Sequence, residues 1–151
     1  MKNTNNIKVY TIGFTKKNAE KFFNLLLDNK VKRIVDIRLS NTSQLAGFAK
    51  ADDLRYFLKT IAGIEYAYLP ELAPTQEIMD AYKKLKGDWK VLEKNYLSLI
   101  AARKVERMDI KDLLDGGCLL CSEDKPDKCH RRLAAEYLKS KWGNIDIVHL
   151  Y

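Results

Sequence analysis

Strand-like and helix-like segments alternate along the whole of this chain, and that alternation limits the folds it can adopt. Apolar runs at residues 8–13, 33–38, 64–69, 118–121 and 145–149 predict five strands. Between them, apolar residues recur at helical spacing, as Leu54, Leu58 and Ile61 do before Gly63. Such alternation is typical of α/β proteins with a parallel sheet. We therefore predict a three-layer, Rossmann-like α/β sandwich of about five mostly parallel strands, with helices on both faces.

The length and composition suit a single globular domain over residues 1–151. The chain has 151 residues, of which 46% are hydrophobic, which is enough for an ordinary core and excludes disordered, collagen-like and disulfide-scaffold classes. No apolar run approaches the roughly 18 to 20 residues of a membrane span, and residues 1–6 lack the apolar core of a signal peptide. We expect a cytoplasmic protein with no membrane partner.

The net charge of the chain indicates which class of binding partner to expect. Lys and Arg total 27 against 20 Asp and Glu, so the formal net charge is +7. This excess favours an anionic small molecule or nucleic acid, but the positive residues are dispersed and identify neither. No cofactor and no oligomeric state follow from these features.

Three polar loops should meet at one edge of the predicted sheet. They follow the first, second and fourth strands, and ligands of α/β sheets bind beyond the carboxyl ends of the strands. The first loop holds Thr15, which we also expect to cap the next helix. The second holds Asp36, Arg38 and Ser43. We expect Asp36 to anchor backbone amides and Arg38 either to bind ligand phosphate or to pair with Asp36. Ser43 can either hydrogen-bond ligand or simply form part of the turn.

The loop after the fourth strand is the richest in chemical groups. It runs into a predicted helix that begins near Cys129 and is capped by Asp124 or Asp127. Free amides and the helix dipole favour an anion at such a helix start, and Arg131 and Arg132 can add bidentate contacts to a phosphate.

Thiol chemistry is the second prediction for this loop. A helix start lowers a thiol pKa, which makes Cys129 a candidate nucleophile. His130 can transfer protons near neutral pH, Glu123 can orient it or act as a base, and Cys121 lies at the strand end. The alternative is that Cys121 and Cys129 are small core residues.

A zinc site is a further alternative. Cys118, Cys121, Cys129 and His130 form a set of four ligands that is formally sufficient for zinc. However, Cys118 and Cys121 stand three residues apart on one predicted strand and should point to opposite faces of the sheet. We therefore assign no metal site from the sequence.

These residues resemble domain-of-unknown-function family 488, a group of small α/β proteins. The resemblance rests on Thr11-Ile12-Gly13, on Asp36-Ile37-Arg38 with Ser43 and Phe48, on residues 66–72, and on Cys121-x-Glu123-x-x-Pro126-x-x-Cys129-His130-Arg131. The chain has Phe14-Thr15 where the family pattern commonly has His-Ser, Asn41 where it commonly has Pro, and Ala73-Pro74 where it commonly has Gly-Gly. The resemblance implies the fold and a site at the signature residues, but no reaction.

Three functions remain open at this stage. The first is an enzyme or enzyme-like protein that holds a phosphorylated ligand, such as a nucleotide or a nucleic-acid end, near the thiols. The second is a nucleic-acid-binding module without catalysis, and the third is a structural zinc domain.

Overall fold

A computed structural model describes residues 6–42, 47–84 and 87–151 and contains the predicted parallel sheet. All four strand pairings are parallel, and the strand order is β3-β2-β4-β1-β5. The strands are β1 (Ile7–Gly13), β2 (Arg33–Asp36), β3 (Glu65–Tyr68), β4 (Gly117–Cys121) and β5 (Ile145–Leu150). The predicted α/β fold class is confirmed.

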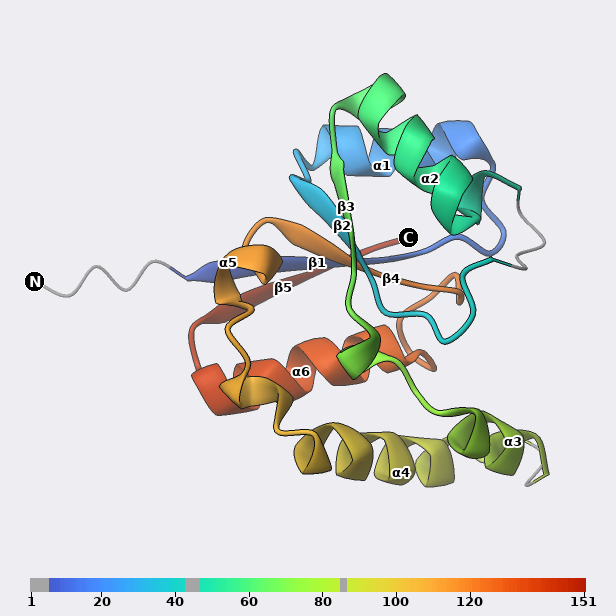
Figure 1. The fold of residues 1–151 in the computed structure, drawn as a ribbon, viewed down its shortest axis with the longest axis vertical. Coiled ribbons are helices and arrows are strands. Elements are labelled where there is room, and N and C mark those ends of the chain that lie inside the picture. The colour runs from blue at the N-terminus through green and yellow to red at the C-terminus, as the bar shows by residue number, and fades with distance from the viewer. Residues whose placement is uncertain (1–5, 43–46, 85–86) are drawn as a thin grey trace, which may run out of the picture.

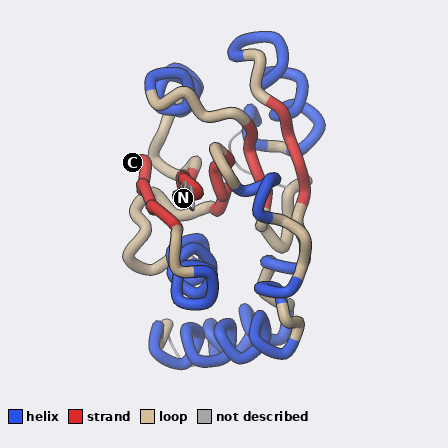
Figure 2. The backbone as a smooth tube through the Cα atoms, turned by 90° about the vertical axis from the view of Figure 1, so that its left-hand side faces the viewer, coloured by secondary structure: helices blue, strands red, loops and turns tan. Residues whose placement is uncertain are grey.

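Helices cover both faces of the sheet, as Figures 1 and 2 show. On one face lie α1 (Ala19–Asp28) and α2 (Ala51–Phe57), which a π-helical turn, Leu58–Ala62, extends to Gly63. On the other face lies α6 (His130–Trp142), with α4 (Trp89–Ala102) packed against it. The remaining helices are α3 (Gln76–Lys84) and α5 (Lys111–Leu114), and the 3-10 turns are Gly47–Ala49, Pro70–Leu72 and Val105–Arg107.

Each face of the sheet carries its own hydrophobic core. Strand β4 is buried throughout and divides its side chains between the two. Cys118 and Leu120 pack in the core under α1 and α2, whereas Leu119 packs in the core under α6 and α4. Because successive side chains of a strand alternate between faces, Cys121 follows Leu119 to the α6 side. The prediction that Cys118 and Cys121 point to opposite faces is confirmed.

Two predicted helix caps are wrong. Asn18, not Thr15, caps α1, with its side chain accepting from the Lys21 amide. Cys129 occupies the cap position of α6 and makes no side-chain capping bond. The carboxylate of Asp124, one of the two expected caps, is instead drawn to the Lys17 ammonium.

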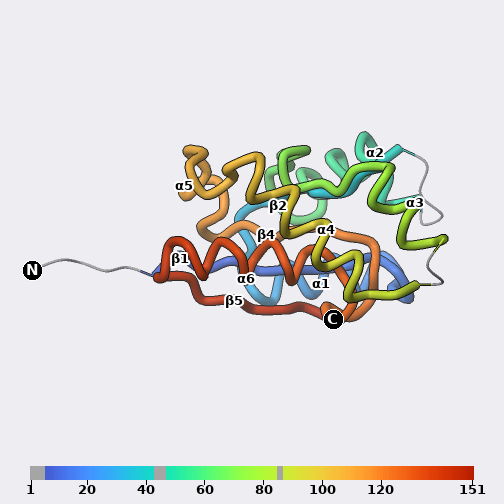
Figure 3. The backbone as a smooth tube through the Cα atoms, turned by 90° about the horizontal axis from the view of Figure 1, so that it is seen from below, coloured from blue at the N-terminus to red at the C-terminus, as the bar shows by residue number. Residues whose placement is uncertain are grey.

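The order of the strands places the three polar loops together. Strands β2, β4 and β1 are neighbours in the sheet, so the loops that follow them leave at the same edge. In Figure 3, α3 lies at this end of the molecule and α5, which leads into the amino end of β4, lies at the opposite end. Within the described residues, no helix is both long and apolar enough to cross a membrane.

Candidate functional site

A pocket of about 400 Å³ opens beyond the carboxyl ends of β2 and β4. The loop after β2 forms one side with Arg38 and Leu39, and the loop after β4 forms another with Ser122 and Glu123. Helices α3 and α4 close the remaining side. The volume lies within the roughly 300–1,000 Å³ typical of small-molecule sites.

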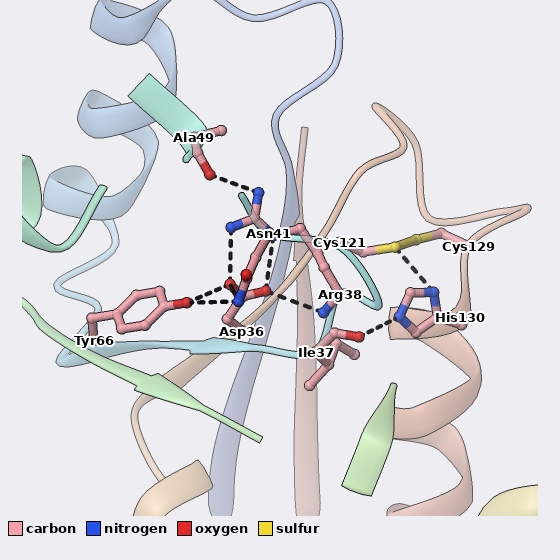
Figure 4. Close-up of polar contacts among 9 residues, drawn as sticks. All are labelled: Asp36, Ile37, Arg38, Asn41, Ala49, Tyr66, Cys121, Cys129 and His130. Carbon is pink, nitrogen blue, oxygen red and sulfur yellow. Dashed lines mark hydrogen bonds and ion pairs between the residues drawn. A yellow bond between two sulfur atoms is a disulfide. The ribbon is translucent and has the colours of Figure 1, made fainter. Parts of the chain in front are cut away.

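The signature cysteines and histidine meet at this pocket. Cys121 ends β4 and Cys129 precedes α6, and their sulfur atoms are joined in a disulfide (Figure 4). The imidazole Nδ1 of His130 lies 3.2 Å from the Cys121 sulfur. All three residues line the pocket. The sequence-based prediction of these residues as one cluster therefore agrees with their positions, although no disulfide was expected.

The hydrogen bonds of His130 determine which ring nitrogen carries the proton. Nε2 lies 2.9 Å from the backbone carbonyl of Ile37, and a carbonyl can only accept. Nε2 must therefore hold the proton, which leaves the Nδ1 lone pair facing the sulfurs. Burial lowers the pKa of His130 from 6.5 to about 4, against a partly compensating bond to Ile37, so the ring is neutral at pH 7.

Asp36 and Arg38 pair with each other. Both side chains are almost completely buried, and the guanidinium donates to both carboxylate oxygens at 2.8 Å. Arg38 also donates to the Ala49 carbonyl at 2.7 Å, and the Tyr66 hydroxyl donates to Asp36 at 2.5 Å (Figure 4). Asn41, where the family pattern commonly has proline, adds a long contact of 3.4 Å to Asp36. This network holds the start of the loop after β2 in place.

Arg131 holds the loop after β4 in place rather than facing the pocket. It is fully buried, and its guanidinium donates to the backbone carbonyls of Glu123 and Asp124 and to the Thr11 hydroxyl. Burial lowers the pKa of Arg131 to about 10, so it remains charged at neutral pH. Lys17 supports the same loop through its 2.7 Å ion pair with Asp124.

The close approach of the loops after β1 and β4 depends on Gly13. A Cβ atom at Gly13 would overlap the backbone carbonyl of Glu123 and crowd the Arg131 guanidinium. The Thr15 amide bonds to the Ser122 carbonyl at 3.0 Å, which joins the two loops through their backbones.

Several residues predicted at the site do not reach the pocket. Thr15 is exposed and, like Arg131 and Arg132, is not among the described lining residues. Arg132 instead binds the Glu136 carboxylate and the Asp127 carbonyl on the surface. Ser43 lies outside the described residues. Of the predicted phosphate ligands, only Arg38 lines the pocket, and Asp36 neutralises its charge.

The pocket wall from α3 and α4 was not predicted from the sequence. Met79, Tyr82 and Trp89 line it, and the rings of Tyr82 and Trp89 meet edge to face at 6.4 Å. Lys83 and Lys128 add exposed ammonium groups. In the sequence, Met79 and Tyr82 fit the ordinary apolar stripe of a crossover helix. The position of Tyr82 and Trp89 on either side of the Gly87 break was the available signal.

Three of the four residues considered as zinc ligands are brought together. The ligand atoms of Cys121, Cys129 and His130 all lie within 4.8 Å of one another. Cys118 is fully buried in the opposite core, where burial raises the pKa of its thiol. The four-ligand structural zinc site is therefore excluded by the course of β4 through the sheet.

Comparison with known proteins gives one match. A family model described as domain of unknown function DUF488 matches residues 18–138, a segment that contains both the Asp36 network and the Cys121–Cys129 pair. No curated protein and no solved structure gives a significant match.

Proposed function

Because this chain belongs to the DUF488 family, whose description specifies no activity, the chemistry of its pocket must guide the assignment, and we propose that it binds a phosphorylated small molecule of the nucleotide type. The observation that carries the proposal is one pocket that combines an aromatic wall, cationic side chains and a cysteine–histidine cluster. The site would lie at the loops after β2 and β4, with the loop after β1 supporting them.

The aromatic wall supports a planar group in the ligand. Tyr82 and Trp89 expose part of their rings to a pocket of about 400 Å³. Stacking of a nucleic-acid base on such rings is worth about 1–3 kcal/mol per base and tolerates different bases. A nucleotide base would fit against this wall.

The cationic side chains support a phosphate in the ligand. Arg38 is neutralised by Asp36, so the uncompensated positive charge comes from Lys83 and Lys128, for which the described part of the chain provides no carboxylate partner. The first turn of α6 also borders the pocket through Cys129 and His130. Its amides and the positive end of the helix dipole favour an anion there.

The groups that could act on the bound ligand are Cys121, Cys129, His130 and Glu123. All four line the pocket. His130 is neutral at pH 7, and the two cysteines are reactive only after reduction. Glu123 is exposed to solvent.

Tryptophan fluorescence provides a direct test. The chain has two tryptophans, so a W142F variant leaves Trp89 as the only reporter. We expect saturable quenching by nucleoside monophosphates and weaker binding of the matching nucleosides, which lack the phosphate. K83Q and K128Q should each weaken nucleotide binding ~5-fold, about 1 kcal/mol. K139Q, at the exposed far end of α6, is the charge-matched control and should change nothing.

Two results would count against this function. One is equal affinity for nucleosides and nucleotides, which would remove the role of the phosphate. The other is binding only to oligonucleotides, with a steep fall of affinity in salt and no effect of K83Q or K128Q, as expected for a nucleic-acid-binding module that does not use the pocket.

A further inference from the structure

Two cysteine sulfurs and an imidazole nitrogen converge at one point on the pocket floor. Cys121 comes from the end of β4, and Cys129 and His130 come from the start of α6. Their ligand atoms lie within 4.8 Å of one another, and the cluster lies outside the Asp36 and Arg131 networks that shape the loops. The disulfide explains why the two sulfurs lie together, but it does not explain why the imidazole nitrogen lies beside them.

Among the described residues, none donates a proton to the Nδ1 lone pair of His130 in the disulfide form. Nε2 donates to Ile37, so Nδ1 can only accept, and the atom next to it is the Cys121 sulfur at 3.2 Å. A disulfide sulfur carries no proton to donate. A metal ion would use this lone pair directly.

The surroundings of His130 are those of a metal-binding histidine. Ligating histidines usually donate their second ring nitrogen to a carboxylate or backbone carbonyl, which fixes the tautomer and the ring orientation. The 2.9 Å bond to Ile37 does this here, and the Tyr96 ring packs edge to face on the imidazole at 5.4 Å.

The backbone spacing of the cysteines also suits two ligands of one ion. Their Cα atoms are 7.1 Å apart, wider than the roughly 4.4–6.8 Å usual between disulfide partners. An ion between the sulfurs would bridge such a separation through two metal–sulfur bonds of about 2.3 Å each.

We propose that Cys121, Cys129 and His130 of the reduced protein bind one Zn²⁺ ion, with a fourth coordination position open to the pocket. Two thiolates and an imidazole favour zinc over the hard cations Mg²⁺ and Ca²⁺. Three protein ligands with one open position are the arrangement of catalytic rather than structural zinc. The site goes beyond the proposed ligand binding and does not depend on it.

Zinc binding and the disulfide exclude each other. A phosphine reductant and water convert the disulfide to two thiols and a phosphine oxide. Zn²⁺ then replaces both thiol protons, which are released to solvent, and forms two zinc–thiolate bonds. The zinc ion and its two thiolate ligands together carry no net charge. Burying this neutral group in the pocket floor therefore costs less than burying a free dication.

The open coordination position of the zinc ion would face the pocket in which a ligand would bind. Cys121, Cys129 and His130 all line the pocket, and among its described lining residues Glu123 is the carboxylate. A water molecule at the fourth position would have its pKa lowered towards 7 by the zinc.

Cobalt substitution tests the site without any pocket ligand. Protein reduced with a phosphine and desalted under anaerobic conditions is titrated with Co²⁺ and then with Zn²⁺. We expect ~1 equivalent of Co²⁺ to give thiolate-to-cobalt charge transfer and the visible bands of a tetrahedral ion, and Zn²⁺ to displace it. Azide should shift the visible bands, because it can enter an open fourth position.

The chain supplies matched controls for each ligand type. C121A, C129A and H130Q should lose stoichiometric binding, and H130Q still allows a side-chain amide to donate to Ile37. C118A and H149N remove the remaining cysteine and histidine and should bind as the unmodified protein does. Circular dichroism of every variant shows whether it has folded.

A measurement on the unmodified protein covers the case in which a variant fails to fold. Zn²⁺ should slow alkylation of Cys121 and Cys129 at least ~10-fold and leave Cys118 unchanged, as peptide mass mapping would show. Absence of stoichiometric metal binding, or binding that survives H130Q, would overturn the zinc site. If azide leaves the visible cobalt bands unchanged, the proposal of an open fourth position is overturned. None of these outcomes bears on nucleotide quenching of Trp89.

Discussion

The hydroxyl of Tyr66 on β3 donates to the carboxylate of Asp36 on β2 at 2.5 Å, from the strand next to it in the sheet. The same carboxylate receives the bidentate guanidinium of Arg38. A buried ion pair is thus completed by a residue that the sequence places 30 positions away. Burial and the Asp36 carboxylate raise the pKa of Tyr66, so the hydroxyl keeps its proton and remains a donor.

Removing the charge of Asp36 should strongly destabilise the fold. D36N leaves the buried Arg38 guanidinium without its counter-charge, and breaking such a pair costs about 3–5 kcal/mol. Y66F removes only one donor and should cost about 1–3 kcal/mol. Urea denaturation measures both changes. E65Q is the adjacent control: its 3.6 Å contact with Arg33 is largely exposed, and a change of more than about 1 kcal/mol there would contradict this interpretation.

A methyl group at Gly13 should disturb the joined loops. In G13A the new Cβ would overlap the Glu123 carbonyl, which is fixed backbone held by Arg131. We expect a loss of about 3 kcal/mol in the free energy of unfolding, because crowding a packed region forces backbone shifts. The control G47A meets no atom within 4 Å and should be neutral. Equal stability of G13A and G47A would show that the loops separate at little cost.

Stability should fall as His130 is forced to take up a proton. In the metal-free disulfide form its pKa is about 4, below the 6.5 of an exposed histidine, so between these pH values the unfolded chain binds more protons than the folded one. The contribution is therefore complete above pH 6.5 and is lost as pH falls towards 4, by at most about 3 kcal/mol. Urea denaturation at several pH values measures it.

The variant H130Q isolates this effect from the carboxylates that titrate in the same range. It removes the titrating ring but allows the bond to Ile37. The difference in unfolding free energy between H130Q and the unmodified protein should shrink as pH drops from 6.5 to 4. A difference that stays constant would mean that the ring does not titrate as described.

Tyr96 should matter more for stability than its single hydrogen bond suggests. It is fully buried, its hydroxyl donates to the Leu72 carbonyl at 2.6 Å, and its ring packs on His130. Y96F leaves that carbonyl without a donor and should cost about 1–3 kcal/mol in thermal or urea unfolding. Y56F, at a tyrosine that is 63% exposed, should change stability by less than about 0.5 kcal/mol.

Local pattern predicted most of the architecture. Alternating strand and helix periodicity predicted the parallel sheet. The two wrong caps have different causes. Asn18, one turn beyond Thr15, caps α1 through a local bond, whereas the Asp124 carboxylate is paired with Lys17 from a distant segment.

The site was predicted in part. Chain spacing alone was enough to group Cys121, Cys129 and His130, because a strand end and the next helix start must meet at the same edge of a sheet. The binding partners of the arginines could not be predicted from the sequence in this way. A guanidinium satisfies a phosphate or a backbone carbonyl equally well, and only the folded loops determine that Arg131 binds Glu123 and Asp124.

The sequence by itself determined the α/β fold class, the opposite orientations of Cys118 and Cys121, and the cysteine–histidine cluster, because each depends on local periodicity. Only the tertiary structure decided that Tyr66 completes the Asp36–Arg38 pair, that Tyr82 and Trp89 line the same pocket as the cluster, and which nitrogen of His130 carries the proton. These depend on the order of strands and on contacts between residues far apart in the chain, and no local pattern encodes them.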